Sequence, residues 1–243
     1  MRIKRLLTLA IVCLGANMTW AQSSQIKSMD MPANVSASTV VSDYISAIGG
    51  LQKVNAVDYL VTRRVANSPL GELEVYEVNS KNMDKVESLS MGGNVINKKV
   101  VQGDKGFIIS NGNQIDLHPV EVSIAKMGAA PFAELTYFDR DIFTFIELSG
   151  VEVINEEEVY RLDMVRKDGL KMSAFYGVNS GLKVRSVNES AGQLVTTDYD
   201  SYKETEGILF PTLLTVSGSI PMPLELVTKT IEVNPSNPEA LFK

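Results

Sequence analysis

Cysteine and histidine are nearly absent from this chain of 243 residues, which contains one of each. The cysteine, Cys13, lies close to the N-terminus, and the histidine, His118, comes directly before a proline. A serine or cysteine hydrolase usually needs histidine as its base, and a zinc site usually needs several histidine or cysteine ligands. The Gly-x-Ser-x-Gly, His-Glu-x-x-His and phosphate-loop patterns are also missing. The sequence therefore predicts no catalytic residue, no metal and no cofactor, and we interpret His118 as a solvated loop residue.

Long hydrophobic runs are missing too, because a membrane-spanning helix takes about 20 apolar residues and no segment reaches that length. The apolar run Leu6–Leu14 is short, follows three basic residues and precedes the small residue Ala21. This arrangement is typical of a secretory leader, so we expect residues 1–21 to be removed and the mature chain to begin at Gln22. A retained anchor and a lipoprotein cut before Cys13 are the alternatives.

Basic residues are in the minority, with 23 Lys and Arg against 29 Asp and Glu and a formal net charge of −6. The leader contains three basic residues and no acidic one, so its removal changes the charge from −6 to −9. A chain this acidic is a poor partner for nucleic acid or an anionic membrane surface. Removing 21 of 243 residues leaves 222, which suits one domain. We expect a disordered lead-in over residues 22–36 and a single domain over residues 37–243.

Alternation of apolar and polar residues is plentiful, most clearly over Leu170–Ser217. Four short runs here have the period of two that places apolar side chains on one face of a strand. Turns that contain glycine separate the runs, beginning with Asn179-Ser180-Gly181. The stretch therefore predicts an antiparallel meander in which the order of strands in the sheet equals their order in the sequence.

A helix is expected over Ser38–Ile48, because its apolar residues recur at helical spacing and Gly49-Gly50 follows. Short strands then recur from Val57 to Leu117 and from Ile142 to Val233, about twelve in all. Short strands at this even spacing predict an all-β sandwich or an open barrel.

The alternation stops over Val120–Phe138. Pro119 is suited to the first position of a helix that Gly128 would end, and Pro131 to the start of a second, short helix. Apolar residues at helical spacing would form one side of each helix, and they are the candidate ligand-binding residues: Val120, Ile124, Met127, Phe132, Leu135 and Phe138. Two interpretations stay open: the segment plugs the sheet as core, or it is a movable lid over an apolar pocket.

Arg63 and Arg64 are adjacent in a predicted strand, so their side chains should point to opposite faces of the sheet. One of them should face inward and need an acidic partner, because a buried unpaired charge is costly. A purely structural ion pair would satisfy this requirement.

Three stretches of the C-terminal half resemble the LolA-like family of outer-membrane lipoprotein-sorting proteins and their relatives. They are the words YGVNSGLKVR, TTDYDSYKETEGILFP and KTIEVNP, with the features Tyr176, Gly181–Arg185, Tyr202–Glu204, Gly207-Ile208, Phe210-Pro211 and Val233–Pro235. The N-terminal word VSDYISAIGG and the strand EEEVYRLDMV are also similar to this family. Related domains are appended to insulinase-type peptidases.

The resemblance implies a mainly β fold, in which a strongly curved antiparallel sheet forms an incomplete, half-open barrel with an N-terminal helix and a short helical lid or plug. It implies a non-catalytic protein of the periplasm or cell envelope of a Gram-negative bacterium. Such a protein would bind a lipid, an acyl chain or a lipoprotein anchor in the apolar concavity, and Arg63 or Arg64 would hold the lid closed. The alternative is a protein-interaction module with an envelope protein as partner, whose own helices fill the concavity.

Overall fold

The computed structural model describes residues 34–68, 71–190, 192–218 and 222–243. The predicted leader and the lead-in up to residue 33 lie outside the described residues. Within these ranges, no helix is both long enough and apolar enough to cross a membrane.

The first helix, α1 (Ala37–Ala47), lies within one residue of its predicted position. Ser36 caps it, since the Ser36 Oγ accepts a hydrogen bond from the backbone N–H of Thr39 at 3.2 Å. The predicted apolar stripe is buried, and a short second helix, α2 (Leu51–Asn55), follows the glycine pair. The buried stripe consists of Val40, Val41, Tyr44, Ile45 and Ile48.

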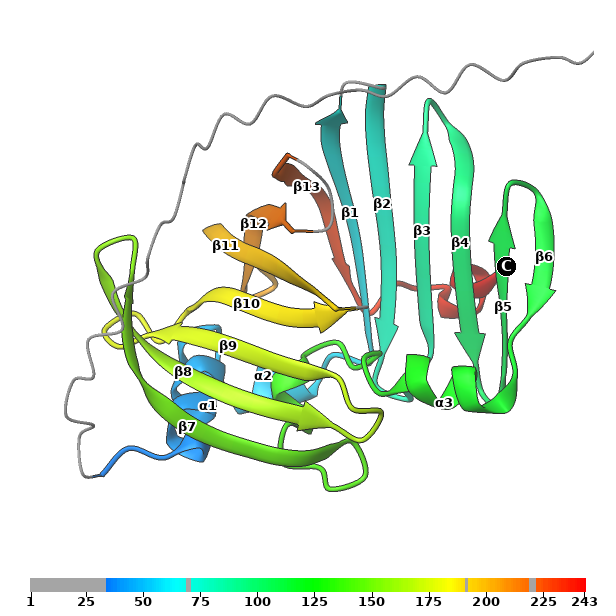
Figure 1. The fold of residues 1–243 in the computed structure, drawn as a ribbon. Helices are drawn as coiled ribbons and strands as arrows, with labels where there is room; N and C mark the ends of the chain where they lie inside the picture. Colours follow the sequence, from blue (N-terminus) through cyan, green and yellow to red (C-terminus); the bar gives the residue numbers. More distant parts are fainter. Residues whose placement is uncertain (1–33, 69–70, 191, 219–221) are drawn as a thin grey trace, which may run out of the picture.

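Thirteen strands in the described ranges form one antiparallel sheet, in the order β6-β5-β4-β3-β2-β1-β13-β12-β11-β10-β9-β8-β7. Figure 1 shows β1–β5 running nearly upright on the right and β7–β10 running across the lower left, so the sheet is strongly curved. Both ends of the sheet are free edges, which makes it an open barrel, as predicted. The strands are β1 (Tyr59–Ser68), β2 (Gly71–Ser80), β3 (Lys85–Met91), β4 (Asn94–Gln102), β5 (Lys105–Ser110), β6 (Asn113–Asp116), β7 (Phe143–Ile154), β8 (Glu157–Arg166), β9 (Lys171–Gly177), β10 (Lys183–Ser190), β11 (Gln193–Thr205), β12 (Ile208–Ser217) and β13 (Leu224–Val233).

The predicted meander is confirmed, because β9, β10, β11 and β12 are neighbours in sequence order. β7 is one long strand, which shifts register between Phe143 and Phe145 and again between Leu148 and Gly150. These irregularities hide the strict alternation that a continuous strand would show in the sequence.

The first and last strands, β1 and β13, are neighbours and join the two halves of the sheet. The side chain of Asn234, just after β13, secures this junction. Its Oδ1 accepts hydrogen bonds from the backbone N–H groups of Asp58 and Tyr59 at 2.7 and 3.0 Å, and its Nδ2 donates to the Ala56 carbonyl at 2.8 Å. Asn234 has a φ of 49°, a left-handed conformation that asparagine tolerates better than most residues. The Val-Asn-Pro word therefore has a structural role.

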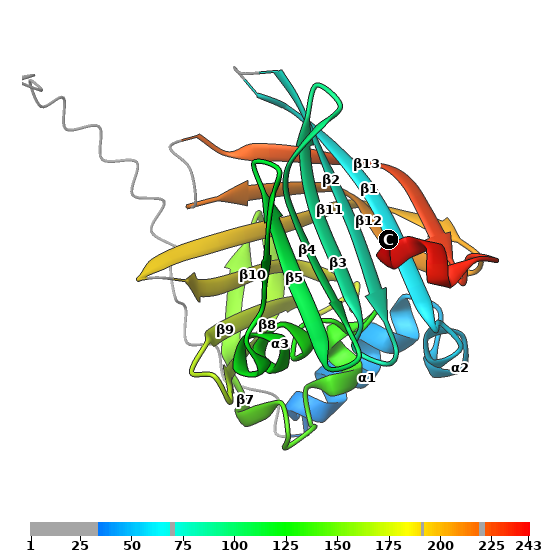
Figure 2. The same cartoon turned by 90° about the vertical axis from the view of Figure 1, so that its right-hand side faces the viewer.

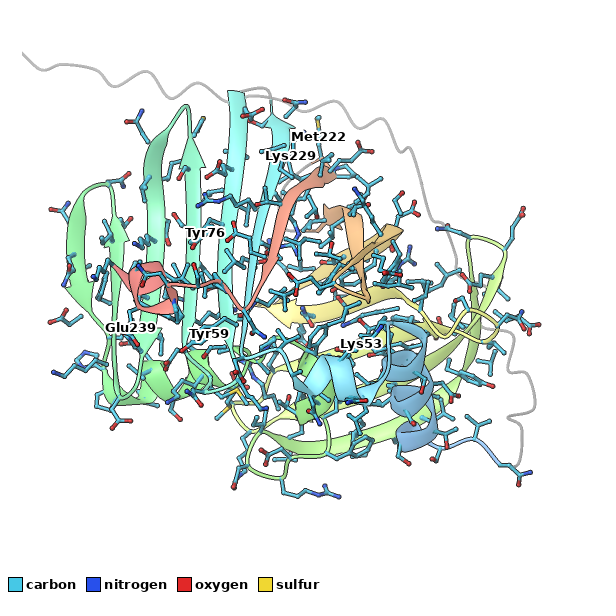
Figure 3. All side chains as sticks on the ribbon, turned by 180° about the vertical axis from the view of Figure 1, so that it is seen from behind. Lys53, Tyr59, Tyr76, Met222, Lys229 and Glu239 are labelled. Atoms are coloured by element: carbon cyan, nitrogen blue, oxygen red, sulfur yellow. The ribbon has the colours of Figure 1, made fainter. Side chains whose placement is uncertain are left out.

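The two faces of the sheet carry separate cores. The inner face carries Leu60, Thr62 and Tyr176, and the largest buried cluster forms where α1 packs on this face across β8 and β9. The outer face carries Tyr59 and Tyr76 beside a row of valines, and the C-terminal helix η2 (Pro238–Phe242) covers part of it. Figure 3 shows Tyr59, Tyr76 and Glu239 together on this outer side.

Two glycines in the stretches that resemble the LolA-like family, Gly49 and Gly181, allow α1 to approach the sheet closely. Gly181 has a φ of 67°, and a Cβ added to it would lie 3.2 Å from the Cβ of Ala47 in α1. A Cβ added to Gly49 would lie 2.5 Å from the carbonyl oxygen of Gly207. The helix is thereby fixed over the inner face, where it fills much of the concavity.

Candidate ligand-binding site

The segment that connects the two free edges of the sheet, residues 117–142, is called here the crossing segment. It contains α3 (Pro119–Lys126) and η1 (Ala133–Thr136), a single turn of 3-10 helix. Figure 2 shows α3 beside the lower ends of the sheet strands. The prediction that Pro119 opens a helix is confirmed, and His118 lies just before it, where its backbone N–H donates to Glu121 Oε2 at 2.7 Å.

Two of the candidate ligand-binding residues, Val120 and Ile124, lie outside the buried side of α3, and their role in ligand binding stays a prediction. Val120 and Ile124 are 63% and 38% exposed, whereas Val122 is buried. Met127, the third residue of the predicted set, is partly buried and packs against the main core. The helix contacts β4 and β5, and this contact selects the side that carries Val122. Spacing alone did not identify it, because apolar residues occur on both sides.

The predicted apolar side of the second helix is only partly right. Phe132 is buried, but Leu135 and Phe138 are 39% and 46% exposed. The expected spacing needed a helix through residues 132–138, whereas η1 is one turn long and Phe132 precedes it with an extended backbone. The residues that η1 buries instead are Glu134 and Thr136, followed by Tyr137.

Glu134 and Lys183 form a buried ion pair between the crossing segment and β10. Lys183 Nζ lies 2.8 Å from Glu134 Oε1, and the two side chains are 12% and 4% exposed. The phenol of Tyr176 donates a second hydrogen bond to the same oxygen at 3.0 Å. Burial alone would lower the pKa of Lys183, but the charge of Glu134 reverses this, and the pKa is raised well above its usual value. Lys183 is therefore a firmly protonated cation.

Tyrosines surround this ion pair. Burial, together with the negative charge of Glu134, raises the pKa of Tyr44 and of Tyr176 well above the ordinary value of a phenol. Burial also raises the pKa of Tyr137 to about 12, although Lys183 opposes the shift. The phenols consequently stay neutral, and the hydrogen bond that Tyr176 donates to Glu134 offsets part of the loss of water around the pair.

A cavity of about 190 Å³ lies beside the ion pair, on the inner face. Its polar lining includes Thr62, Arg64, Glu134 and Lys183, and Tyr44 of α1 also lines it. Its apolar lining comes from the crossing segment and from β1, β12 and β13, through residues that include Leu60, Phe132, Leu209, Phe210 and Ile231.

A second cavity, of about 170 Å³, lies on the other side of Phe132 and is lined mainly by apolar side chains. Val54, Val57, Met83 and Leu135 contribute to it. Ala130, Pro131 and Phe132 line both cavities, so this short piece of the crossing segment is the partition between them. The ring of Phe132 stacks on that of Phe210, with centroids 5.9 Å apart.

The two arginines point to opposite faces, as predicted. On the outer face Arg63 pairs with Glu74 at 3.3 Å and lies over the ring of Tyr76. Arg64 lines the first cavity and pairs with Glu77, while its Nε is buried without a hydrogen-bond partner. The expectation that an arginine holds the lid finds no support: among the described residues, neither arginine is bonded to the crossing segment, and Lys183 makes that connection.

Arg64 belongs to a polar row across the inner face. Thr62, Glu77, Glu87 and Lys99 are direct cross-strand partners on β1 to β4. Burial would raise the pKa of Glu87, but Lys85, 2.7 Å away, and Lys99 hold it below its usual value. Apolar residues lie beyond this row, including Ala66, Leu214 and Leu226. The inner face therefore has a polar band between two apolar regions.

A larger hollow, of about 540 Å³, lies on the outer face beside Phe242. Its lining mixes Val100 and Phe107 with charged residues of the β4–β5 turn, Asp104 and Lys105. The first cavity is the better candidate site despite its smaller volume, because a buried ion pair and an unpaired arginine nitrogen adjoin it.

Sequence reasoning did not identify Glu134 or Lys183 as a pair. In the sequence Lys183 alternates with Leu182 and Val184, a pattern that indicates the polar face of a strand, and Glu134 lies between apolar residues of an expected helix. The feature of the sequence that could have indicated the pair is Glu134 itself, an acidic residue among apolar residues in the segment where the alternation stops. Its partner lies 49 residues away, so spacing carried no information about the contact.

The fold is that of LolA-like proteins, an open barrel around an N-terminal helix. A LolA superfamily protein from Nitrosomonas europaea superposes with a TM-score of 0.57 at 15% identity, covering 86% of this chain and 98% of that one. A DUF1329 family protein from Desulfovibrio piger superposes with a TM-score of 0.56 at 11% identity, covering 85% and 96%. No family model matches the sequence, and no curated protein matches it.

Proposed function

We propose that this is a non-catalytic protein of the bacterial cell envelope that binds an acyl chain, of a lipid or of a lipoprotein anchor, beneath the crossing segment. The observation that carries the proposal is the partition at Ala130–Phe132, which separates two partly apolar cavities. A displacement of this short piece would join the two cavities into one elongated space. The LolA-like fold and the predicted leader support the same assignment.

Burial of the chain would supply the binding energy. Each methylene transferred from water contributes about 0.8 kcal/mol, so a chain that places several methylenes against Leu209, Phe210 and Ile231 gains several kcal/mol. Displacement of Phe132 from Phe210 and ordering of the chain oppose this gain. The Glu134–Lys183 pair lies next to the partition and would anchor the rest of the crossing segment while the partition moves.

Lipid binding by the wild type and by a blocked variant tests the proposal. Ala130 lines both cavities, so Ala130→Trp should fill them and weaken binding of a fluorescent fatty acid at least tenfold. The matched control is Val120→Trp, at an exposed position of α3 in the same segment, which should bind like the wild type. Mass spectrometry of lipid extracted from the purified protein provides an independent test. Absence of both extracted lipid and added-probe binding would reject the proposal.

A second candidate function is a protein-interaction module, and one observation favours it. Val120, Ile124, Leu135 and Phe138 of the crossing segment are large apolar residues with exposed side chains. Much of the inner face is also occupied by α1, as the self-filled alternative requires. The double variant Ile124→Glu, Phe138→Glu should abolish recovery of an envelope partner in this case, while lipid binding stays unchanged, because neither residue lines a cavity.

A further inference from the structure

We infer that the ligand is a single acyl chain with an anionic head group, a carboxylate or a phosphate, and that Arg64 binds this head group in the first cavity. The inference rests on the proposed function and adds the chemical class of the ligand. It follows from the charge that lines the cavity, from the unsatisfied donor of Arg64 and from the volumes of the two cavities.

Two cations line the first cavity, and each is paired with one carboxylate, Lys183 with Glu134 and Arg64 with Glu77. Arg64 and Lys183 contribute two cations, and Glu134 is the one carboxylate among the described lining residues. Glu134 is already bonded to Lys183 and to Tyr176, which leaves Lys183 neutralised. Arg64 differs from Lys183 in one respect: Glu77 accepts from its Nη1, and its Nε is left without a hydrogen-bond partner.

The Nε of Arg64 is a buried donor without a partner. Buried polar groups almost always have hydrogen-bond partners, and an unsatisfied one needs an explanation. A guanidinium has five N–H donors in a planar fork that matches two oxygens of a carboxylate or phosphate. Thr62 adds a hydroxyl to the same cavity lining. An anionic head group would satisfy Arg64 and leave the acyl chain on the apolar side, toward Phe132.

The space suits one chain rather than several. The cavities measure about 190 and 170 Å³, and together they fall at the lower end of the range of about 300–1,000 Å³ typical of ligand pockets. The second cavity lies beyond Phe132 and is lined mainly by apolar side chains, so it fits the tail of a chain whose head lies at Arg64.

The test compares cis-parinaric acid with its methyl ester, which has the same fluorescent chain but no charge. The wild type should bind the acid about 10- to 100-fold more tightly, the range expected of a hydrogen bond to a charged group. Arg64→Gln should lose this preference. Arg63→Gln is the matched control, because Arg63 lies next in the chain but on the outer face, and it should keep the preference.

Each other outcome has a defined meaning. Equal affinity of the wild type for acid and ester overturns the inference but leaves the proposed function intact, whereas binding of neither probe rejects both. Displacement of the acid by inorganic phosphate or acetate alone would also overturn it, because a free anion would then occupy the site. If Arg64→Gln does not fold, the variant Glu77→Gln is measured instead. This variant removes the carboxylate that pairs with Arg64, so binding of the acid relative to the ester should become stronger. An unchanged ratio of the two affinities contradicts the inference.

Discussion

Glu134 and Lys183 are the residues whose loss should affect this protein most. Both charges are removed from water, and each compensates the other at 2.8 Å. Glu134→Gln should therefore lower the free energy of unfolding by about 3–5 kcal/mol, because it leaves Lys183 buried without a counter-charge. The measurement is urea denaturation followed by circular dichroism.

Two comparisons separate the ion pair from general disruption. The double variant Glu134→Leu, Lys183→Met removes both charges and should be much more stable than the single variant, since apolar replacements of a buried pair are often neutral. Arg63→Gln breaks a half-exposed pair and should change stability by less than about 1 kcal/mol. A double variant as unstable as Glu134→Gln would contradict the assignment.

The buried tyrosines and Lys183 predict a loss of stability in alkaline solution. The phenol of Tyr137 ionises near pH 10.0 in an unfolded chain but has a pKa of about 12 here, and the pKa of Lys183 is likewise raised above its unfolded value of 10.5. Groups whose pKa is raised by folding stabilise the protein below the unfolded pKa and lose this contribution as the pH rises toward the folded pKa. Unfolding free energies should therefore fall above about pH 10.

Urea titrations between neutral pH and pH 12, beside tyrosinate absorbance, check this expectation. Tyr137→Phe removes one of the shifted phenols and should make the alkaline decline shallower. A decline that is complete below pH 10 would mean that other groups control it.

The orientation of Arg63 and Arg64 could be predicted from the sequence, whereas the Glu134–Lys183 pair could not. Adjacent positions on a strand face opposite sides, and this rule placed Arg63 and Arg64 correctly. The same alternation predicts that Lys183 lies on the solvent-exposed face of its strand, because a charged residue in an alternating run is normally exposed. A charge is buried only when its partner is buried with it, and that partner belongs to a segment distant in sequence.

At the scale of elements, the crossing segment is attached firmly in some places and exposed in others. Ala129 accepts a hydrogen bond from the backbone N–H of Ser80 at 3.1 Å, and Lys126 donates to the Gly103 carbonyl at 3.1 Å. The exposed residues Leu135 and Phe138 should tolerate change: Leu135→Glu and Phe138→Glu should each alter stability by less than about 1 kcal/mol.

Phe132 is the contrast within the same segment. Phe132→Ala removes a buried, stacked ring and should lower the free energy of unfolding by about 3–5 kcal/mol. Thermal and urea unfolding of the three variants measure the difference. A large loss in Leu135→Glu would mean that this side chain is buried in solution and that the original expectation of an apolar inner side was right.

The junction of β1 and β13 depends on Asn234, whose side chain makes three hydrogen bonds to the backbone before and at the start of β1. Asn234→Ala should cost about 1–3 kcal/mol, because three backbone groups lose their partner. The matched control is Asn237→Ala, three residues on, where the side chain makes no capping hydrogen bond to η2. Equal stability of the two variants by urea denaturation would show that the junction does not depend on this side chain.

The elements themselves were more predictable than their assembly. Local patterns located α1 to within a residue and gave the order of β9 to β12, because alternation, helical spacing and turn glycines are properties of neighbouring residues. The pairing of β1 with β13 has no local signal. It joins the first and the last strand, which are the farthest apart in the sequence.

For the whole molecule, the leader predicts a mature chain that begins at Gln22 and carries no lipid. Intact-mass spectrometry of protein purified from the cell envelope should give the mass of residues 22–243. A mass that corresponds to a chain beginning at an acylated Cys13 would contradict this, and would make the protein membrane-anchored rather than free.

The pairing of the first strand with the last sets the order in which this protein completes its fold. A chain that is synthesised from its N-terminus presents β1 long before β13 exists, so one edge of β1 stays unpaired until β13 has been made. Contacts between distant parts of a chain form slowly, because the intervening chain must first be ordered. Leu60, Thr62 and Arg64 on β1 and Ile231 on β13 line the first cavity, so its wall closes in this final step. Folding intermediates and chains truncated before β13 should therefore be unable to hold a ligand, and binding competence should arise only with the complete polypeptide.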